Sequence, residues 1–325
     1  MAEPHMCDLT IILATASSEA VVAPTLASLR EAVSGSALSI EVLLVENAPS
    51  SSLGKLALGP VCASVGVRYL HEATPGKSHA LNCALRQARG RVLVFTDDDL
   101  RFPTGWLERM TAPIRNGSAM AVAGGVRLAP HLLRPWMNCT HRAWLASTAD
   151  YLSPTAPSEM CGANMAVDRR VFDRVGGFDT ELGPGVTNGG EESLLSWQIR
   201  ECGWRIEPAF DAEVEHHLNP DRLKYKHWLK AATLKGWSRA YLRHHWFHEP
   251  IDHPRKTLMV LRTKLLVRRR ITARPGPDEE GIAPWELSYV EEIAACSRYM
   301  RERERPRNYA RRGIQKLGAV PAFAS

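Results

Sequence analysis

The sequence predicts an α/β protein with a doubly wound, mainly parallel sheet, followed by a helical C-terminal extension. Three observations support this fold class. Strand-like and helix-like segments alternate from residue 9 to about residue 125, with lengths typical of βα repeats. One apolar strand leads directly into three carboxylates, Asp97, Asp98 and Asp99, as expected where a ligand binds at the carboxyl ends of parallel strands. The segment 250–325 is strongly basic and mostly helical in pattern.

Short runs of Val, Ile and Leu mark the strands, and Ala and Leu at helical spacing mark the helices between them. The expected strands are 9–13, 40–45, 65–70, 92–95 and 119–126, and the helices between them are 20–33, 78–89 and 104–114. Residues 128–157 show no clear pattern. A strand is expected at 159–168, helices at 170–175, 191–202 and 221–245, and a loop with four glycines at 183–190. Helices of this length between strands imply parallel pairing.

The composition is that of a soluble globular protein, with 45% hydrophobic and 23% charged residues in a chain of 325. The net charge of +6 suits an anionic partner. Seven scattered cysteines without a C-x-x-C pair argue against a disulfide framework or a zinc site and favour a reducing compartment. No targeting segment and no apolar stretch of roughly 20 residues is apparent, so a cytoplasmic location is expected.

The acidic triplet is the strongest indication of a site. Asp97, Asp98 and Asp99 repel one another, so a cation among them would stabilise the turn. Oxygen ligands at the end of a buried strand suit Mg²⁺ or Mn²⁺, and such an ion would carry the phosphates of a substrate. The alternative interpretation is an acidic surface turn after a strand.

Two further segments are expected at the same edge of the sheet. Glu46 ends the second strand and could accept hydrogen bonds from a nucleobase or a ribose, although a solvated turn acid would look the same. Lys77 lies at a helix start, in Pro75-Gly76-Lys77-Ser78-His79-Ala80-Leu81-Asn82, where helix amides and an ammonium group favour phosphate. The spaced glycines and Lys-Ser/Thr pair of a Walker loop are missing.

Two pairs of polar residues complete the candidate set. Glu191 and Glu192 open a helix after the glycine loop, and Glu192 lies on the same helix face as Leu195 and Ile199. An inward carboxylate beside such a loop could be a general base, and a pair of acids complementing the helix dipole is the alternative. His216-His217 could bind metal or phosphate, or could be structural.

Taken together, these segments resemble the family 2 glycosyltransferases, enzymes with the GT-A fold that use nucleotide-diphosphate sugars. The resemblance extends from about Asp8 to Arg239. The matching segments are Val45-Glu46-Asn47, Pro75 to Asn82, Phe95-Thr96-Asp97-Asp98-Asp99, Cys161-Gly162-Ala163-Asn164, Val175-Gly176-Gly177-Phe178-Asp179, Gly190-Glu191-Glu192, and His216 with Asn219-Pro220-Asp221-Arg222-Leu223.

The resemblance implies a role for each matching position. Asp97 and Asp99 match the D-x-D element that holds the metal on the diphosphate. Because the triplet leaves the register open, Asp97 or Asp98 could bond the ribose rather than the metal. His216 matches a metal or phosphate contact. Thr15 and Glu46 match nucleoside contacts, Lys77 and Asn82 lie in the segment facing the nucleoside, and Gly162, Ala163 and Asn164 match the strand along the sugar and acceptor pocket. Glu192 matches the general base, with Glu191 as the alternative.

The resemblance also implies the reaction and the organisation of the chain. In-line attack by an acceptor hydroxyl, opposite a metal-bound diphosphate, would invert the anomeric configuration. The expected halves of the GT-A domain are 1–127 for the nucleotide sugar and 128–248 for the acceptor and catalysis, with a basic helical extension at 249–325. The Q-x-x-R-W element of processive synthases is absent, which favours the addition of single sugars.

Two departures from the family pattern affect the roles of individual residues. Glu46-Asn47 replaces the more usual Asp-Asp or Asp-Asn, which lengthens the nucleoside contact. Glu191-Glu192 replaces a common Glu-Asp, so the base would reach one methylene further.

The expected partners are a nucleotide-diphosphate sugar and a glycan or lipid-linked acceptor, as in the synthesis of cell-surface glycans or glycolipids. Residues 255–274 contain many cations and no acid, with leucines interleaved. Such a helix can lie peripherally on an anionic membrane, or it can pack its Leu face on the catalytic domain; both interpretations remain open.

Three other classes of protein were weighed against this resemblance. A nucleotidyltransferase of similar fold would be expected to have a glycine-rich Lys/Arg loop after the first strand, which residues 13–18 do not provide. A nucleic-acid-binding protein would explain the basic charge, but the acids gather at the expected cleft and no nucleic-acid motif is present. A catalytically inactive relative acting as a binding protein is disfavoured by the retained acids.

Overall fold

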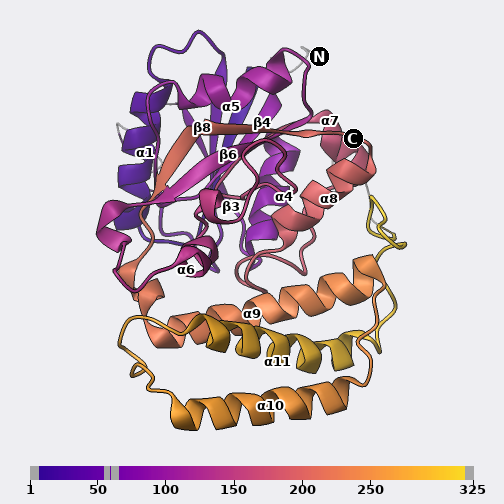
Figure 1. Cartoon of the computed structure of the whole chain (residues 1–325). Coiled ribbons are helices and arrows are strands. Elements are labelled where there is room, and N and C mark those ends of the chain that lie inside the picture. Colours follow the sequence, from indigo (N-terminus) through magenta and orange to yellow (C-terminus); the bar gives the residue numbers. More distant parts are fainter. Residues whose placement is uncertain (1–6, 55–58, 60–65, 319–325) are drawn as a thin grey trace.

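The computed structural model describes residues 7–54, 59 and 66–318 and contains one eight-stranded sheet with helices on both faces (Figure 1). The strands are β1 (Cys7–Thr15), β2 (Ile40–Glu46), β3 (Val67–His71), β4 (Gly90–Thr96), β5 (Leu100–Arg101), β6 (Ala121–Leu128), β7 (Asn164–Asp168) and β8 (Ile206–His216). The helices are α1 (Glu19–Val33), α4 (Lys77–Gln87), α5 (Trp106–Arg115), α6 (Cys139–Trp144), α7 (Arg170–Val175), α8 (Glu191–Glu201), α9 (Tyr225–Leu242), α10 (Pro254–Ile271) and α11 (Pro284–Glu302).

The strand order is β3-β2-β1-β4-β7-β6-β8-β5, which confirms the predicted mainly parallel α/β sheet. Strands β1 to β4 pair in parallel, as the alternation of strands and helices indicates. The expectation of parallel pairing fails at two strands: β7 runs antiparallel to β4 and β6, and β5 runs antiparallel to β8. The sheet continues across residue 127 through the β4–β7 pairing, and the division into halves stays a prediction.

The centre of the sheet is buried on both faces, which explains the continuous apolar runs in β1 and β4. On one face Ile12 and Phe95 pack with residues of α4, α7 and α8. On the other face Leu9 and Val94 pack with residues of α1 and α5. The side chain of Trp106, in α5, is fully buried there. The paired layers fix the carboxyl ends of β1, β2 and β4 rigidly in space.

Three predicted elements differ from the structure. β8, with 11 residues, lies where the sequence pattern predicts no strand, because Pro208 and the outward-facing acids of this segment obscure the strand signal. The strand predicted at 159–168 begins only at Asn164, after a turn in which the Asn164 amide donates to the Cys161 carbonyl. The helix predicted from Asp221 begins at Tyr225, because Pro220–Leu223 forms a 3₁₀ turn.

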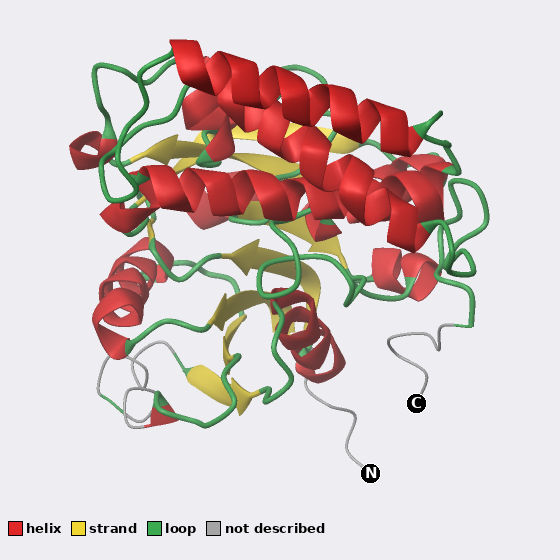
Figure 2. Cartoon of the chain, turned by 90° about the horizontal axis from the view of Figure 1, so that it is seen from below, coloured by secondary structure: helices red, strands yellow, loops and turns green. Residues whose placement is uncertain are grey.

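Three long helices cover the end of the molecule next to the carboxyl edge of the sheet (Figures 1 and 2). α9 packs along α11, and α11 packs along α10, which is the outermost of the three. Leu223, Trp228 and Leu287 are buried in the core that joins α9 and α11 to the sheet domain. In the part of the chain that is described, no helix is long and apolar enough to cross a membrane.

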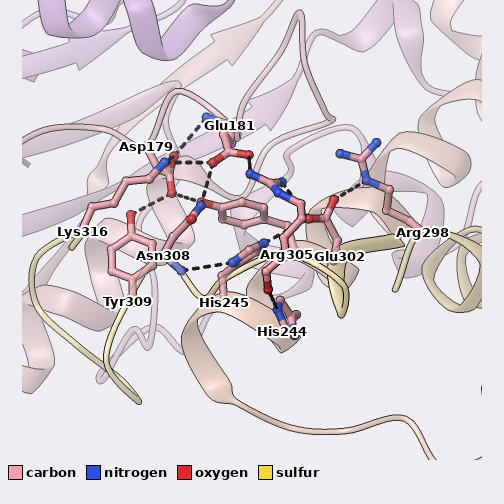
Figure 3. A network of polar contacts seen from close by, with 11 residues as sticks. Asp179, Glu181, His244, His245, Arg298, Glu302, Arg305, Asn308, Tyr309 and Lys316 are labelled. Carbon is pink, nitrogen blue, oxygen red and sulfur yellow. Dashed lines mark hydrogen bonds and ion pairs between the residues drawn. The ribbon is translucent and has the colours of Figure 1, made fainter. Parts of the chain in front are cut away.

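A network of acids, of which Asp179 and Glu302 are buried, anchors residues 298–316 to the sheet domain (Figure 3). We call it the tail cluster: Asp179, Glu181 and Glu302 with their partners Tyr241, His245, Arg298, Arg305, Asn308, Tyr309 and Lys316. The Lys316 ammonium lies 2.8 Å from Asp179, and Arg305 donates to Glu181 at 2.6 Å and to Glu302 at 2.8 Å. The contacts of Lys316 with Asp179 and of Arg305 with Glu181 join residues more than 120 positions apart and hold the C-terminal segment in place.

Candidate active site

The sheet brings the predicted polar residues to one edge. Thr15, the last residue of β1, pairs with Glu46, the last residue of β2. β4 ends beside them at Thr96 and leads into the acidic triplet. Because β7 is antiparallel to β4, its start at Asn164 lies opposite Thr96, and the preceding residues 161–163 reach the same edge. His216 ends β8 and pairs with Leu100, directly after the triplet.

Each aspartate of the triplet has a different partner. The Asp97 carboxylate forms an ion pair with the Lys77 ammonium, and the Asp98 carboxylate accepts a hydrogen bond from the Thr15 hydroxyl. Burial raises the pKa of Asp98, and repulsion by its acidic neighbours adds to this rise, although the Thr15 hydrogen bond opposes it. Asp99 lies beside His216, with 3.1 Å between Oδ1 and Nε2.

The Asp99–His216 pair has the arrangement of an incomplete metal site. His216 Nδ1 lies 3.2 Å from the Leu145 carbonyl oxygen, which can only accept, so Nδ1 carries the hydrogen. In a neutral ring Nε2 then presents a lone pair to Asp99 Oδ1, an oxygen that is buried without a hydrogen-bond partner. Two lone pairs that face each other need a proton or a cation between them. A histidine that binds a metal is usually oriented in this way, with its other ring nitrogen donating to a backbone carbonyl.

Cations hold the Asp99 carboxylate in its charged form. Burial by itself would raise the pKa of Asp99, but the neighbouring His216 and the more distant charges of Arg222 and Lys77 outweigh it and lower that pKa. The Asp99 carboxylate is therefore available as an anionic ligand at neutral pH.

The start of α4 places Lys77 at the centre of the site. Gly76, before the helix, has φ +125°, and a Cβ at Gly185 would lie 2.9 Å from the Gly76 Cα atom, so the glycine loop packs directly on this helix start. The Lys77 amide donates to the Pro184 carbonyl at 2.8 Å. Burial lowers the pKa of Lys77, but attraction to Asp97 and to Glu191 outweighs it and raises that pKa, so the ammonium stays charged.

The two glutamates at the start of α8 have different surroundings, and the predicted burial of Glu192 is wrong. Both line the cavity, but Glu191 is only 3% exposed and its Oε2 has no hydrogen-bond partner, whereas Glu192 is half-buried. One position along a helix rotates a side chain by about 100°, so Glu191 takes the buried direction beside Leu194 and Leu195. Burial, with repulsion by Glu192, raises the pKa of Glu191 well above its ordinary value.

A cavity of about 780 Å³ lies between the sheet edge and the helical layer. Lys77, Asp97, Gly162 and Glu192 line its sheet side, and an ideal Cβ built at Gly162 would lie 3.7 Å from Lys77 Nζ and 3.8 Å from the Glu192 Cβ. The opposite wall comes from the helical layer: Lys235, Ser238, Arg239 and Leu242 of α9 and Glu291 of α11. Trp144 and Trp197 add aromatic surface. The cavity is large enough for a sugar unit and part of an acceptor.

Three predicted donor contacts are engaged within the protein. The Glu46 carboxylate accepts from Ser52, Leu53 and the Tyr69 hydroxyl, and although burial opposes them, these bonds lower the pKa of Glu46 to about 2. The Asn82 side-chain amide donates a hydrogen bond to the Phe178 carbonyl and accepts one from the Phe178 backbone N–H. Asn164, contrary to expectation, does not line the cavity: its fully buried amide bonds Trp106 and the carbonyls of Gly125 and Ala212.

The predicted metal ligands are only partly brought together. Asp99 and His216 are adjacent, whereas Asp97 is turned toward Lys77. Among residues 7–54, 59 and 66–318, no group of three or more His, Cys, Asp or Glu side chains is gathered closely enough to hold a metal ion by itself. His217 follows directly after β8, is partly exposed, and bonds Glu215 at 2.7 Å.

No local pattern in the sequence indicates the cavity wall formed by α9. Lys235 lies over the Trp144 ring, 4.2 Å from its centroid, and Arg239 pairs with Glu292 of α11. The two helices pack together although their residues are more than 50 positions apart, so neither composition nor periodicity indicates that α9 faces the site.

A match to known families decides the classification. The model of the family described as "Glycosyl transferase family 2" matches residues 10–176, just over half of the chain. The chain belongs to glycosyl transferase family 2. This finding confirms the predicted family, and with it the glycosyltransferase class.

Individual relatives of this family 2 protein are distant. It is 24% identical over 200 residues to polypeptide N-acetylgalactosaminyltransferase 3 of Drosophila melanogaster and to polypeptide N-acetylgalactosaminyltransferase 13 of Homo sapiens. Those matches cover 54% of this chain, but only 30% and 35% of the relatives, so the chain spans about a third of their length.

Solved structures of similar shape support the GT-A-type fold. A mannosyltransferase from Pyrobaculum calidifontis, in complex with GDP-Man and Mn²⁺, superposes with a TM-score of 0.61 at 19% identity, covering 91% of this chain and 88% of that one. A GalNAc transferase with UDP, GalNAc and Mn²⁺ superposes with a TM-score of 0.52 at 16% identity, covering 75% of this chain and 49% of that one.

Proposed function

We propose that this family 2 protein transfers a single sugar from a nucleotide-diphosphate donor to an acceptor hydroxyl, with metal dependence and inversion of the anomeric configuration. The observation that carries the proposal is the cavity, whose sheet side brings the Lys77–Asp97 pair together with Glu192 beside Gly162. The Asp99–His216 edge begins two residues beyond Asp97. Cationic groups and acids thus flank a space in which a donor sugar could lie between a phosphate site and a base.

Mg²⁺ or Mn²⁺ fits the residues at the end of β4. The partnerless Asp99 Oδ1 and the lone pair of His216 Nε2 would hold the ion, with Asp97 as a third ligand if Lys77 turned to the phosphates. One or two carboxylates completed by substrate phosphates are the usual protein contribution to such a site. When bound, the ion would neutralise the diphosphate leaving group. The mannosyltransferase and the GalNAc transferase described above both contain Mn²⁺.

Donor binding would use two kinds of residues. Thr15, Lys77, Asp97 and Asp98 lie at the sheet edge and would contact the nucleotide or its phosphates directly. Glu46, Asn82 and Asn164 would act by holding the loops and strands of the donor site, since their polar groups are already bonded within the chain.

Glu192 is the proposed general base. It lines the cavity, and its Oε2 accepts one hydrogen bond, from the Gly190 amide at 3.1 Å, which leaves acceptor capacity free. The acceptor oxygen would attack the anomeric carbon as its proton passes to the Glu192 carboxylate, and the bond to the diphosphate oxygen would break on the opposite side. Glu191, whose raised pKa favours the neutral form, is less suited to accept a proton.

The acceptor would be a hydroxyl of a glycan or of a lipid-linked carrier, bound along the α9 wall of the cavity. Trp144 and Trp197 offer apolar rings, and Lys235 and Ser238 offer polar contacts. A cytoplasmic location, at the inner surface of a membrane, would suit a lipid-linked acceptor.

Glutamine substitutions test the base assignment. We expect Glu192→Gln to keep donor binding, measured by thermal shift, and to slow donor hydrolysis by about 100-fold or more, since water is the simplest acceptor. Glu191→Gln is the matched control, with the same change one position away, and should retain most of the rate. If Glu192→Gln hydrolysed the donor at the wild-type rate and Glu191→Gln lost that activity, Glu191 would be the general base.

A further inference from the structure

The outer face of α10 exposes an unusual set of apolar side chains. Met259, Val260, Leu266, Val267 and Ile271 are 64%, 39%, 61%, 55% and 81% exposed. The predicted Leu stripe of this helix is divided by the structure: Leu258 and Leu265 are buried toward α11, whereas Met259 and Leu266 face solvent. The two interpretations of this helix are therefore compatible, because one face packs on the protein and a second apolar face remains open.

The segment that carries this face is strongly cationic. Eight of the chain's 41 Lys and Arg residues lie in 254–274, and none of its 35 Asp and Glu residues does, so this segment accounts for the net charge of +6. Lys256, Thr263 and Arg270 recur every seven residues and form a row between the exposed apolar side chains. Within the described residues no carboxylate pairs with Arg255, Lys256, Arg262, Lys264 or Arg270.

The helix is firmly attached to the rest of the molecule. Arg269 pairs with the buried Glu286 of α11, and Arg268 lies over the Trp285 ring, 4.6 Å from its centroid. α11 packs on α9, which lines the cavity, and the tail cluster ties the chain beyond α11 to Asp179. A surface that held α10 would therefore also orient α9 and α11, which lie beside it in Figure 1 and line the cavity.

We propose that this face, the α10 face (Lys256, Met259, Val260, Thr263, Leu266, Val267, Arg270 and Ile271), docks on an anionic lipid surface. The apolar side chains would enter the boundary between headgroups and acyl chains, and the long Lys and Arg side chains would reach the phosphates. Docking would hold the α9 wall of the cavity near the lipid. The inference rests on the proposed function in one respect: it identifies the acceptor class as a lipid-linked molecule at that surface.

Charge and apolar exposure together distinguish lipid from other partners. Two copies of this chain meeting through the α10 face would bring two sets of unpaired cations together, which is unfavourable. Nucleic acid would satisfy the cations, but it would leave five apolar side chains in water. An anionic bilayer satisfies both kinds of side chain at once.

Co-sedimentation of the full chain with vesicles tests the proposal. At about 0.1 M salt, we expect binding to phosphatidylcholine vesicles that contain phosphatidylserine, little binding to phosphatidylcholine alone, and weakening as salt rises. The double variant Lys256→Glu/Arg270→Glu should lower the partition coefficient by roughly tenfold or more, given about fivefold for each cation lost. Met259→Ser/Leu266→Ser should lower it as well.

Matched controls use exposed residues elsewhere. Arg86→Glu/Arg200→Glu makes the same change in net charge, and Leu133→Ser/Leu317→Ser removes comparable exposed leucines; both should bind like the wild type. Absence of binding to anionic vesicles, or equal binding by the α10 variants, would overturn the proposal. Concentration-dependent dimers without lipid that Met259→Ser/Leu266→Ser abolishes would assign the face to a second copy instead, and tighter binding to RNA than to vesicles would assign it to nucleic acid.

A second measurement separates this proposal from the proposed function. The α10 variants should keep the unfolding temperature and the metal-dependent thermal shift of the wild type with nucleotide sugars. Donor binding without vesicle binding would remove only the lipid proposal. Vesicle binding without any response to nucleotide sugars would remove the proposed function and leave the docking face.

Discussion

The acids at the sheet edge and the acids of the tail cluster are both buried, but their oxygen atoms have very different partners. In the tail cluster, Asp179 accepts from two tyrosines and one lysine, and Glu302 accepts from a histidine and two arginines. At the sheet edge, Glu191 Oε2 is buried without a hydrogen-bond partner, and Asp99 Oδ1 lies 3.1 Å from His216 Nε2, which donates only when that ring is doubly protonated. Native proteins rarely leave such atoms unpaired unless a ligand or a reaction uses them. We therefore expect the saturated cluster to stabilise the fold and the unsaturated acids to serve the proposed site.

The comparison predicts opposite effects when an acid is removed. In the tail cluster, Asp179→Ala removes the acceptor of the buried Tyr241 and Tyr309 hydroxyls and one of the two acceptors of Lys316. We expect a loss of about 4 kcal/mol in the free energy of unfolding, measured by denaturant titration. The control Asp278→Ala removes an exposed partner of Lys226 and should leave this free energy nearly unchanged. Equal effects of the two substitutions would show that the tail cluster is not structural.

Acid should weaken the tail cluster. Although burial opposes it, hydrogen bonds from His245 and Arg298 lower the pKa of Glu302 to about 2. Because the folded-state pKa lies below the ordinary value, the charged Glu302 stabilises the fold at pH 5 and above, and this stabilisation, of roughly 2–3 kcal/mol, is lost as the pH falls from about 5 toward 2.

Denaturant titrations across this range, on the wild type and on Glu302→Gln, measure the effect. The variant should be the less stable of the two at pH 7, and the difference should shrink as the pH approaches 2. A difference that stays constant with pH would mean that the charge of Glu302 contributes nothing.

At the sheet edge, the charge of Glu191 should have the opposite effect on the free energy of unfolding. Burial and repulsion by Glu192 raise the pKa of Glu191, so the charged form is disfavoured in the folded state, and Glu191 costs stability at pH values above its ordinary pKa. We expect Glu191→Gln to stabilise the fold by about 1 kcal/mol at pH 8, with no gain near pH 4, where the carboxyl is protonated in both states. Thermal unfolding at the two pH values measures the difference, and destabilisation at pH 8 would contradict it.

Parts of the candidate site could be predicted from the sequence, because local patterns indicate them. The buried strand before Asp97, the helix start at Lys77 and the glycine loop before Glu191 each have short-range signals, and family resemblance places them in order. The choice between Glu191 and Glu192 depends on a rotation of about 100° about the α8 axis, which packing on the sheet decides.

The remaining features depend on contacts between distant segments. Asp179 and Lys316 are 137 positions apart, and no periodicity relates them. The division of the α10 leucines between a packed face and an open face required knowledge of where α11 lies. Asn164 matches a pocket position of the family, yet its amide is held by Trp106 and two backbone carbonyls, which only the three-dimensional neighbours reveal.

The most direct test of the account is metal-dependent donor binding at Asp99. Thermal shift of the wild type and of Asp99→Ala should be measured with a panel of nucleotide-diphosphate sugars, each with Mn²⁺, with Mg²⁺ and with chelator. We expect that at least one donor stabilises the wild type only when metal is present, and that Asp99→Ala, still folded, loses this response. Donor binding that is independent of metal, or an unchanged response in Asp99→Ala, would contradict the proposed role of the unsaturated acids.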